Sequence, residues 1–300
     1  GPLAKKEKFD VIHGNAEESY WTGKISKKNK SIYVFTSHTP NIPTTGMLKG
    51  INRPVRFLKS INTYFLRSAI IEADHVVAFS KFSGDLIIKG VGDTCTNKLK
   101  IIPPGVESSW FKVERKPSSN SELLYWGRLE DEKGLPELFH ALEVVSKVIK
   151  DINLTIVGEG NRLMDYKSLV ADLSLTDRVQ FMGWLSSSKI QSLSAQSRLG
   201  LFPSRVESFG LSVVEAMAAG LPVIAASGGA LQENVEKGVT GTLVPVNNAG
   251  ALAKAIISTL ENSKHTESMA RDAKKLVQHK FNWDEAANKM VDLYSFSNGM

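Results

Sequence analysis

The residues Pro203-Ser204-Arg205-Val206-Glu207-Ser208-Phe209-Gly210-Leu211-Ser212-Val213-Val214-Glu215-Ala216-Met217-Ala218-Ala219-Gly220 form the most informative stretch of this 300-residue sequence. The apolar run 199–202 stops at Pro203, and a polar turn precedes a helical pattern that begins near Leu211. That pattern ends at Gly220, where a left-handed C-terminal residue belongs. The stretch therefore predicts a strand, a loop and a helix.

The start of this helix predicts an anion site. Free backbone N–H groups at a helix N-terminus bind anions, so we expect Gly210 and Leu211 to hold a diphosphate. Glu215 lies roughly 6–9 Å along the axis at about 1.5 Å per residue, which suits a ribose. Glu207 would then accept from hydroxyls of the group that the diphosphate carries. Taken alone, the two carboxylates are explained equally well without a ligand, with Glu207 as a solvated loop residue and Glu215 as an ordinary surface residue of the helix.

Strands and helices alternate along the chain. The expected strands are 9–13, 32–36, 75–80, 99–102, 122–126, 153–157, 179–181, 199–202, 223–226 and 241–244. The other expected helices are 55–71, 82–89, 135–149, 161–173, 189–195, 231–235, 249–260, 269–279 and 283–296. Such alternation predicts an α/β protein with parallel sheets and right-handed crossovers.

Linker composition in 113–121 divides this alternation, which begins afresh beyond it. We therefore expect a first Rossmann-like domain over 1–115, a second over 116–282 and a final helix over 283–300. Each doubly wound domain binds ligands at the carboxyl ends of its strands, so a cleft between the two domains is the expected site.

Length and composition agree with two domains. The chain has no apolar run of ~18 residues that could span a membrane, and its start lacks the apolar core of a signal peptide, so a cytoplasmic location is expected. Cys95 is the single cysteine, which excludes an intramolecular disulfide and suits an inert thiol.

Positive charge is concentrated in the first part of the chain. Residues 1–117 hold 19 Lys+Arg and 10 Asp+Glu, a balance of +9, which leaves 18 and 21, or −3, for the rest. One cluster is Lys24, Lys27, Lys28 and Lys30, and a second is Lys49, Arg53, Arg56, Lys59 and Arg67 with apolar residues interleaved. Such a segment can lie on anionic lipid or attract an anionic acceptor, and it also suits a core-facing helix with a solvated basic side. No recognisable nucleic-acid-binding module accompanies the charge, so nucleic acid is not an expected partner.

The motif around Glu207 resembles that of a known enzyme family. The string from Glu207 to Leu211, with Glu215-Ala216-Met217-Ala218 and Gly220-Leu221-Pro222-Val223-Ile224, resembles the E-x7-E signature of the GT-B retaining glycosyltransferases of family 4. The resemblance implies two Rossmann-like domains facing across a cleft, with the final helix crossing back onto the first domain. It also implies a nucleoside-diphosphate-sugar donor and no further cofactor.

A second segment supports the same resemblance. The residues 127–134, Gly-Arg-Leu-Glu-Asp-Glu-Lys-Gly, resemble the family's G-R-x-x-x-x-K-G segment, which implies that Arg128 and Lys133 clamp the diphosphate. A leaving diphosphate gains negative charge, which fixed cations stabilise. By the same resemblance Phe209 belongs to the diphosphate site. The acidic run 130–132 is better explained as a solvated loop than as a metal site, so no catalytic metal is expected.

The resemblance assigns further residues. His38, at the end of its expected strand, matches the histidine that faces the donor sugar, and His13 matches a frequent family histidine with a supporting role. The segment with Gly158 and Gly160 matches the family segment that lines the donor site. The segment with Trp184 and Leu185 matches the one that holds the nucleobase. Taken alone, strand-end histidines are usually structural.

The resemblance also implies a mechanism. Family members retain the anomeric configuration by front-face attack, in which the leaving phosphate takes the acceptor's proton and Glu207 positions sugar hydroxyls. Their usual first strand and glycine-rich loop match nothing in residues 1–8, so we expect the first domain to be truncated. The alternative hypotheses are therefore a non-catalytic nucleotide-sugar-binding protein or an inactive truncated form, with a GT-B epimerase or phosphorylase as a third class. The acceptor is expected to be a glycan, a small molecule or an anionic or lipid-linked molecule.

Overall fold

The computed structural model describes residues 9–15, 19–38, 53–118 and 121–295. Its contacts divide the chain into two compact units. The first consists of Gly1–Pro104 with Trp283–Met300, and the second is Gly105–Asn282.

The first unit is a parallel sheet with helices. Its elements are β1 (Val11–Asn15), α1 (Tyr20–Asn29), β2 (Ile32–Ser37), α2 (Arg53–Glu72), β3 (His75–Ala78), α3 (Lys81–Val91), the 3-10 helix η3 (Asp93–Lys98), β4 (Leu99–Ile101) and α12 (Trp283–Ser295). The strands lie in the order β1-β2-β3-β4, and every pairing is parallel.

Strand β2 shows why this sheet needs helices on both faces. All its residues are buried, and alternate side chains enter two different cores. Tyr33 and Phe35 pack with residues of α2 and α3, whereas Ile32 and Val34 pack with Leu293 of α12. Because side chains alternate along a strand, a β-strand buried on both faces is apolar throughout.

Helix α12 completes the first unit from the far end of the sequence. Its Tyr294 hydroxyl lies 2.8 Å from His13 Nδ1, and Thr36 Oγ1 lies 2.7 Å from His13 Nε2. Burial, and secondarily the nearby His38, lower the pKa of His13. His13 therefore links β1, β2 and α12 as a largely neutral ring at neutral pH.

Helix α1 is not predicted from the sequence, where its residues are notable only for lysines. Its composition is unfavourable because it contains Gly23 and Ser26, and it ends at Lys30 in a left-handed conformation. Tertiary packing explains it: Gly23 lies so close to Tyr33 and Glu72 that a Cβ there would come within 3.1 Å and 2.6 Å of their side chains. The helix therefore forms because it fits against β2 and α2.

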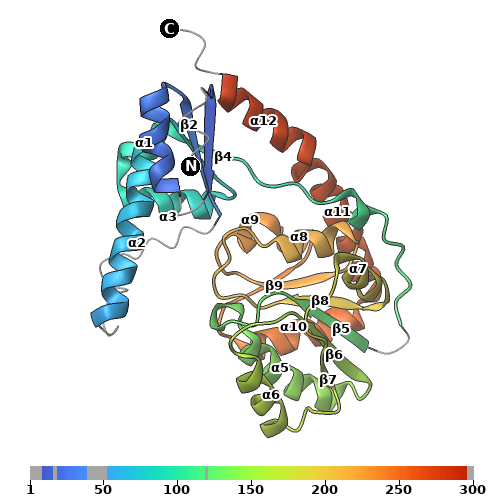
Figure 1. Cartoon of the computed structure of the whole chain (residues 1–300). Helices are drawn as coiled ribbons and strands as arrows, with labels where there is room; N and C mark the ends of the chain where they lie inside the picture. Colours follow the sequence, from blue (N-terminus) through green and yellow to red (C-terminus); the bar gives the residue numbers. More distant parts are fainter. Residues whose placement is uncertain (1–8, 16–18, 39–52, 119–120, 296–300) are drawn as a thin grey trace. The chain divides into compact units, whose positions relative to one another are not determined.

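The second unit has a larger parallel sheet. Its elements are α4 (Ser108–Phe111), β5 (Ser121–Trp126), the 3-10 helix η4 (Asp131–Lys133), α5 (Leu135–Val148), β6 (Ile152–Val157), α6 (Leu163–Asp172), β7 (Val179–Phe181), α7 (Ser187–Gln196), β8 (Leu199–Phe202), α8 (Leu211–Ala218), β9 (Val223–Ala226), α9 (Leu231–Asn234), β10 (Thr242–Val244), α10 (Ala249–Glu261) and α11 (Ser263–Lys280). Within the described residues the six strands have the order β10-β9-β8-β5-β6-β7. Helices cover both faces, with α8 on one and α5 and α10 on the other (Figure 1).

The predicted α/β class with two parallel-sheet domains is confirmed. The second unit begins at Gly105, upstream of the residue 116 expected from linker composition. The segment between them packs there because the Trp110 ring stacks on Trp126, with centroids 5.8 Å apart. In the part of the chain that the structure describes, no helix has the length and apolarity needed to cross a bilayer.

The attachment of α12 to the first core can be tested with Leu293→Ala. Leu293 is 6% exposed and packs in the core with Ile32 and Val34, so we expect a loss of about 2–4 kcal/mol in the free energy of unfolding. Val291→Ala on the same helix is the control, because Val291 is 55% exposed and should change stability by less than about 0.5 kcal/mol. Urea unfolding measures both, and equal losses would contradict the packing of α12.

Candidate functional site

Loops from neighbouring strands of the second sheet meet at its carboxyl edge. The loop after β5 is hydrogen-bonded to the end of β6, with Gly127 N donating to Val157 O at 3.0 Å. Gly158 N, after β6, donates to Gly183 O after β7 at 2.8 Å. Because parallel strands all end at the same edge, these loops form one surface, where ligands of such sheets bind.

Two glycines allow these loops to touch. Gly158 has φ +135°, and a Cβ there would lie 1.9 Å from the Gly127 carbonyl oxygen. A Cβ at Gly160 would lie 2.3 Å from the carbonyl oxygen of Leu129. The structure thus gives Gly158 and Gly160 a packing role, and direct ligand contact by them stays a prediction.

An ion pair joins the loops after β5 and β8. Lys133 Nζ lies 2.7 Å from Glu207 Oε2, and their side chains are only 14% and 21% exposed. The sequence predicts a diphosphate role for Lys133 and a sugar role for Glu207. The two side chains are in direct contact, so ligand groups bound by them would be adjacent.

The backbone around this pair is closely packed. Lys133 ends η4, and Gly134 follows in the left-handed region with φ +68°. A Cβ at Gly134 would lie 2.1 Å from the Pro203 carbonyl oxygen, so only glycine fits without a shift. Arg205 N also donates to Glu132 O at 2.7 Å. These backbone contacts fix the position of the two loops relative to each other, independently of the ion pair.

Arg128, the second predicted cation, lies on the same loop. Its side chain is 66% exposed and pairs with Glu132 at 2.8 Å, while its carbonyl accepts from the Tyr125 hydroxyl at 3.0 Å. The backbone of Arg128 is therefore fixed by a buried tyrosine, and its guanidinium lies in solvent. An exposed pair of this kind contributes little to stability, which leaves the guanidinium available to a phosphate.

The N-terminus of α8 lies beside Glu207. Gly210 is its N-cap with φ +88° and provides no side chain for capping. A Cβ at Gly210 would lie 2.5 Å from Leu231 Cδ2 and 3.4 Å from Glu207 Cγ. Only glycine therefore fits at the helix start without moving these side chains. The first N–H groups of α8 can bind an anion.

Phe209 and Leu211 flank this glycine differently. The Phe209 ring is buried and meets Phe281 edge to face at 5.4 Å, and its carbonyl accepts from the Asn234 side chain. Leu211 begins α8 and is exposed. The predicted diphosphate role of Phe209 can therefore involve its backbone, since its ring belongs to the core.

Glu215 lies one turn further along α8 in an apolar environment. Burial raises its pKa to about 7; the hydrogen bond from Trp126 Nε1, 3.0 Å from Oε2, opposes this rise and Glu107 adds to it. The Trp126 ring stacks on Trp110 and meets Phe202 edge to face at 5.0 Å. The carboxyl group is therefore held in a fixed position by an indole within an aromatic cluster.

The sequence does not identify Trp126 as the partner of Glu215. Its position as the last residue of β5, at the edge where the motif lies, is the signal that could have found it. A second missed contact is the ion pair between Arg205 Nη2 and Glu137 Oε1 at 2.6 Å. Glu137 Oε2 and Arg205 Nε have no hydrogen-bond partner among the described residues. This pair ties the Glu207 loop to α5.

The loop after β7 contains the predicted base-binding residues. Trp184 is 72% exposed and Leu185 is half-buried, and Gly183 between Met182 and Trp184 adopts φ +64°. The hydrogen bond from Gly158 places this loop on the same edge as the Lys133 pair. Base binding by Trp184 and Leu185 stays a prediction.

The predicted histidines lie in the first unit. His38 Nε2 is 3.1 Å from Asn15 Oδ1, and its ring meets Phe79 edge to face at 5.1 Å. Both His38 and His13 therefore have partners within that unit. Among the residues that the structure describes, no three His, Cys, Asp or Glu side chains are grouped as a metal site would require.

Two parallel-sheet units with loops gathered at a strand edge are the architecture of the two-domain glycosyltransferases, and comparison with known families assigns the class. The family model described as glycosyl transferases group 1 matches residues 106–276, and that of glycosyltransferase family 4 matches residues 2–110. The chain therefore belongs to the GT-B glycosyltransferases of family 4, which confirms the resemblance seen in the sequence.

Individual relatives agree with this assignment. An uncharacterised glycosyltransferase of Methanocaldococcus jannaschii is 27% identical over 97% of this chain and 76% of its own length. A glycogen synthase of Mycobacterium tuberculosis is 30% identical over 74% of this chain, which spans about half (54%) of that enzyme. Among solved structures, Anabaena HepE in complex with UDP and glucose has a TM-score of 0.81 and 23% identity, covering 99% of this chain and 82% of HepE.

The environment of Glu215 predicts a pH dependence of stability. Its folded pKa of about 7 exceeds the ordinary value of 4.5, so the folded state binds the proton more tightly than the unfolded state. Stability is then lost as the pH rises from about 4.5 to about 7, by an amount on the order of 3 kcal/mol. Glu215→Gln keeps an oxygen for the Trp126 indole and should remove this loss.

Urea unfolding of wild type and Glu215→Gln at pH 5 and pH 8 measures the effect. The variant should gain stability relative to wild type at pH 8 and much less at pH 5. Glu261→Gln, at an exposed position, is the control and should show no such difference. Parallel curves for wild type and Glu215→Gln would contradict a raised pKa.

Proposed function

We propose that this protein transfers a sugar from a nucleoside-diphosphate-sugar to an acceptor with retention of anomeric configuration and without a metal ion. The observation that carries the proposal is the half-buried pair of Lys133 and Glu207 beside the N-terminus of α8. Membership of a glycosyltransferase family supports the reaction class. HepE, a structural neighbour, has been solved with UDP-glucose, which supports the donor class.

The cations account for the leaving group. A lysine ammonium has three N–H donors, and the bond to Glu207 occupies one of them, so Lys133 can also bind a phosphate oxygen. Arg128 and the backbone N–H groups at Gly210 and Leu211 supply further positive potential on the same edge. Charge that develops on the diphosphate as the glycosidic bond breaks is then stabilised without a metal.

The carboxylates account for the remaining parts of the donor. Glu215 keeps a second oxygen beyond the one bound by Trp126, and that oxygen can accept from a ribose hydroxyl. Glu207 is held by Lys133 and can accept from sugar hydroxyls next to the phosphates. In this proposal Glu207 orients the sugar, and the leaving phosphate takes the acceptor's proton.

The transfer proposal predicts losses in three variants. Lys133→Ala and Arg128→Ala should lower the transfer rate by about 100-fold or more, because each removes a cation that stabilises the leaving diphosphate. Glu207→Ala should abolish transfer by freeing the sugar. The measurement is release of nucleoside diphosphate from uridine, guanosine and adenosine diphosphate sugars, with and without EDTA, and NMR of the product's anomeric configuration.

Lys147→Ala is the matched control, because Lys147 also pairs with a glutamate, Glu143, but on the exposed surface of α5. Its activity should equal that of wild type. Wild-type turnover in any of the three variants, or loss of activity in EDTA, would contradict the proposed chemistry. Calorimetric donor binding without turnover would instead support a non-catalytic nucleotide-sugar-binding protein.

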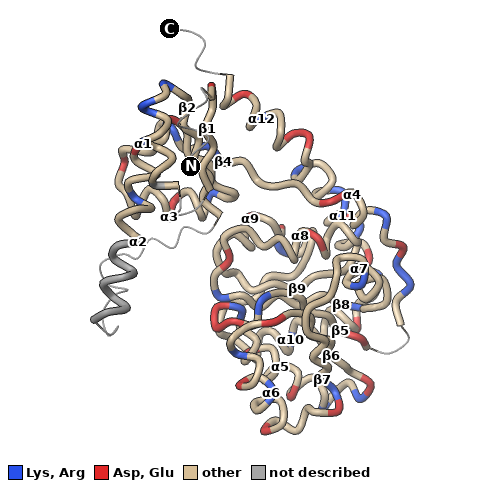
Figure 2. Tube along the Cα trace, viewed as in Figure 1, with Lys and Arg blue, Asp and Glu red and all other residues tan. Residues whose placement is uncertain are grey.

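We further propose that the first unit contacts anionic lipid or an anionic acceptor through α1. Trp21 is 64% exposed, with Lys24 Nζ 5.3 Å from its ring centre, and Lys27 and Lys28 follow on the same helix (Figure 2). Interfacial helices combine an aromatic residue with lysines in this way. Of the second basic cluster, Lys49 lies outside the described residues, and α2 is described only as backbone at Arg53, Arg56 and Lys59.

Vesicle sedimentation tests this contact. Lys24→Glu with Lys28→Glu should weaken binding to phosphatidylglycerol vesicles at least about tenfold, since each lysine near an anionic surface contributes about 1 kcal/mol. Lys254→Glu with Lys264→Glu makes the same charge change in the second unit and should leave binding unchanged. Equal binding by both double variants would contradict a role for α1.

A further inference from the structure

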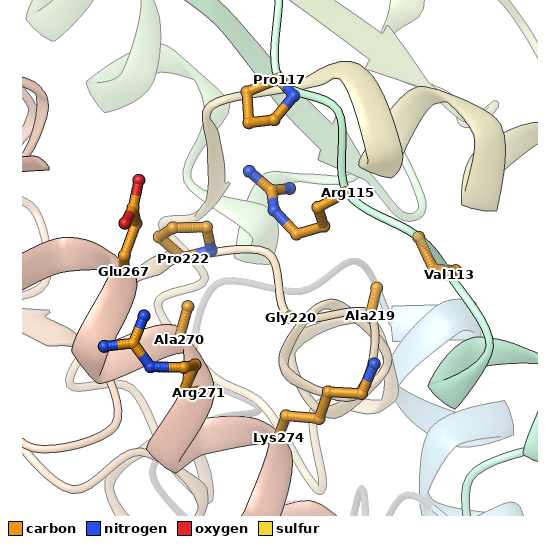
Figure 3. A pocket seen from close by; sticks show the side chains of 10 residues that line it. All are labelled: Val113, Arg115, Pro117, Ala219, Gly220, Pro222, Glu267, Ala270, Arg271 and Lys274. Carbon is orange, nitrogen blue, oxygen red and sulfur yellow. The ribbon is translucent and has the colours of Figure 1, made fainter. Parts of the chain in front are cut away.

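A cavity lies in the second unit away from the motif loops, by which we mean the loops after β5 and β8 that contain Lys133 and Glu207. We call it the basic groove: a cavity of about 380 Å³ between the segment 113–117, helix α11 and the end of α8 (Figure 3). An adjoining cavity of about 330 Å³ shares Arg115, Pro117, Pro222 and Glu267 with it. The two cavities therefore adjoin, each within the volume range of small-ligand sites, and we count both as the basic groove.

The basic groove is at the opposite edge of the sheet from the motif loops. Pro222 directly precedes β9, so the groove lies at the amino ends of the strands. Helix α8 starts at the proposed diphosphate site and ends at the groove, where Ala219 and Gly220 form part of the wall. Eight helical residues span about 12 Å, so one small anion cannot occupy both sites.

The charge of the groove is strongly positive. Its lining includes four cationic side chains, Arg115, Arg198, Arg271 and Lys274, and one carboxylate, Glu267, which leave a net charge of +3. Among the described residues no carboxylate oxygen lies within 4.0 Å of the charged nitrogens of these four side chains. Glu267 acts on Arg115 from a longer distance, so the four cations are at most partly compensated.

Two backbone carbonyls hold the Arg115 side chain in the wall. Its Nη1 donates to Ser194 O at 2.7 Å and its Nη2 to Ser197 O at 2.8 Å, at the end of α7. Burial lowers its pKa to about 10, and Arg198 also lowers it, whereas Glu267 raises it. The guanidinium thus stays charged at neutral pH, and two of its five N–H donors are used. Figure 3 shows this side chain extending toward Pro222 across the hollow.

Helix α11 supplies the opposite wall. Arg271 and Lys274 lie one turn apart on this helix, and burial lowers the pKa of Lys274. A Cβ at Gly220 would be 3.6 Å from Arg115 Cδ and 3.8 Å from Lys274 Cδ, so these two cations also lie near the C-terminus of α8. A favourable interaction with the helix C-terminus accounts for the positions of Arg115 and Lys274. It does not account for the presence of Arg271 and Arg198 in the lining.

We propose that the basic groove binds a small phosphorylated ligand with at least two negative charges. Guanidinium groups bind phosphate oxygens through paired charge-assisted hydrogen bonds, and three arginines from separate segments line this hollow. The concave shape and limited volume favour a small molecule over a polymer. The proposal does not depend on the transfer reaction, because the groove shares no residue with the Lys133 site.

Calorimetric titration with inorganic pyrophosphate tests the groove. The protein carries Arg128→Ala and Lys133→Ala throughout, so that the proposed donor site contributes little. We expect saturable binding at one site that weakens with added salt, and a further change of Arg271→Gln with Lys274→Gln should weaken it at least tenfold. Arg271→Gln alone, at an exposed position, should give an intermediate loss and guards against misfolding of the double variant.

Lys264→Gln with Lys275→Gln is the matched control, because it removes two charges from the same helix outside the groove and should leave affinity unchanged. Absence of saturable binding in the starting variant would overturn the proposal, as would equal affinity after the groove substitutions. The two proposals can fail separately. If the starting variant binds pyrophosphate but the wild-type chain binds no nucleoside-diphosphate-sugar, the groove is supported and the proposed transfer function is refuted.

Discussion

The contact between Lys133 and Glu207 is the interaction on which the candidate site depends. It brings the cation of one loop and the carboxylate of another within 2.7 Å at a half-buried position. An unpaired charge at such a position would be costly, so each residue stabilises the placement of the other. The close fit of Gly134 against Pro203 allows the two loops to approach. A site organised before its ligand binds spends less binding energy on ordering its side chains.

The same edge of the sheet also fixes the more distant carboxylate. Trp126 ends the central strand β5 and donates to Glu215, while its ring is stacked on Trp110 from the segment that enters the second unit. Residues ahead of the sheet thus help to position a side chain of the candidate site. This packing explains why the second unit begins at Gly105 and why Glu215 has a raised pKa.

The sequence predicts most elements because their apolar patterns are local. Strands such as β8 and helices such as α8 have both their burial pattern and their end signals in consecutive residues. Helix α1 escapes prediction because Gly23 and Ser26 are poor helix formers, and its stability comes from packing on Tyr33 and α2. The ion pair between Arg205 and Glu137 is not predicted for a related reason, because its partners are 68 positions apart and no sequence periodicity links them.

The stretch from Pro203 to Gly220 by itself determined a strand, a loop and a helix, because local propensity and turn chemistry are contained in consecutive residues. Its resemblance to a known signature also indicated the family, while the diphosphate and hydroxyl roles of its residues stay predictions. Only the tertiary structure decided that Glu207 meets Lys133, that Glu215 meets Trp126 and that Phe209 turns into the core. The basic groove likewise joins Arg115, Arg198 and α11, which are neighbours only after folding. Contacts between distant segments depend on how strands are ordered in the sheet, and that order is set by packing of the whole domain.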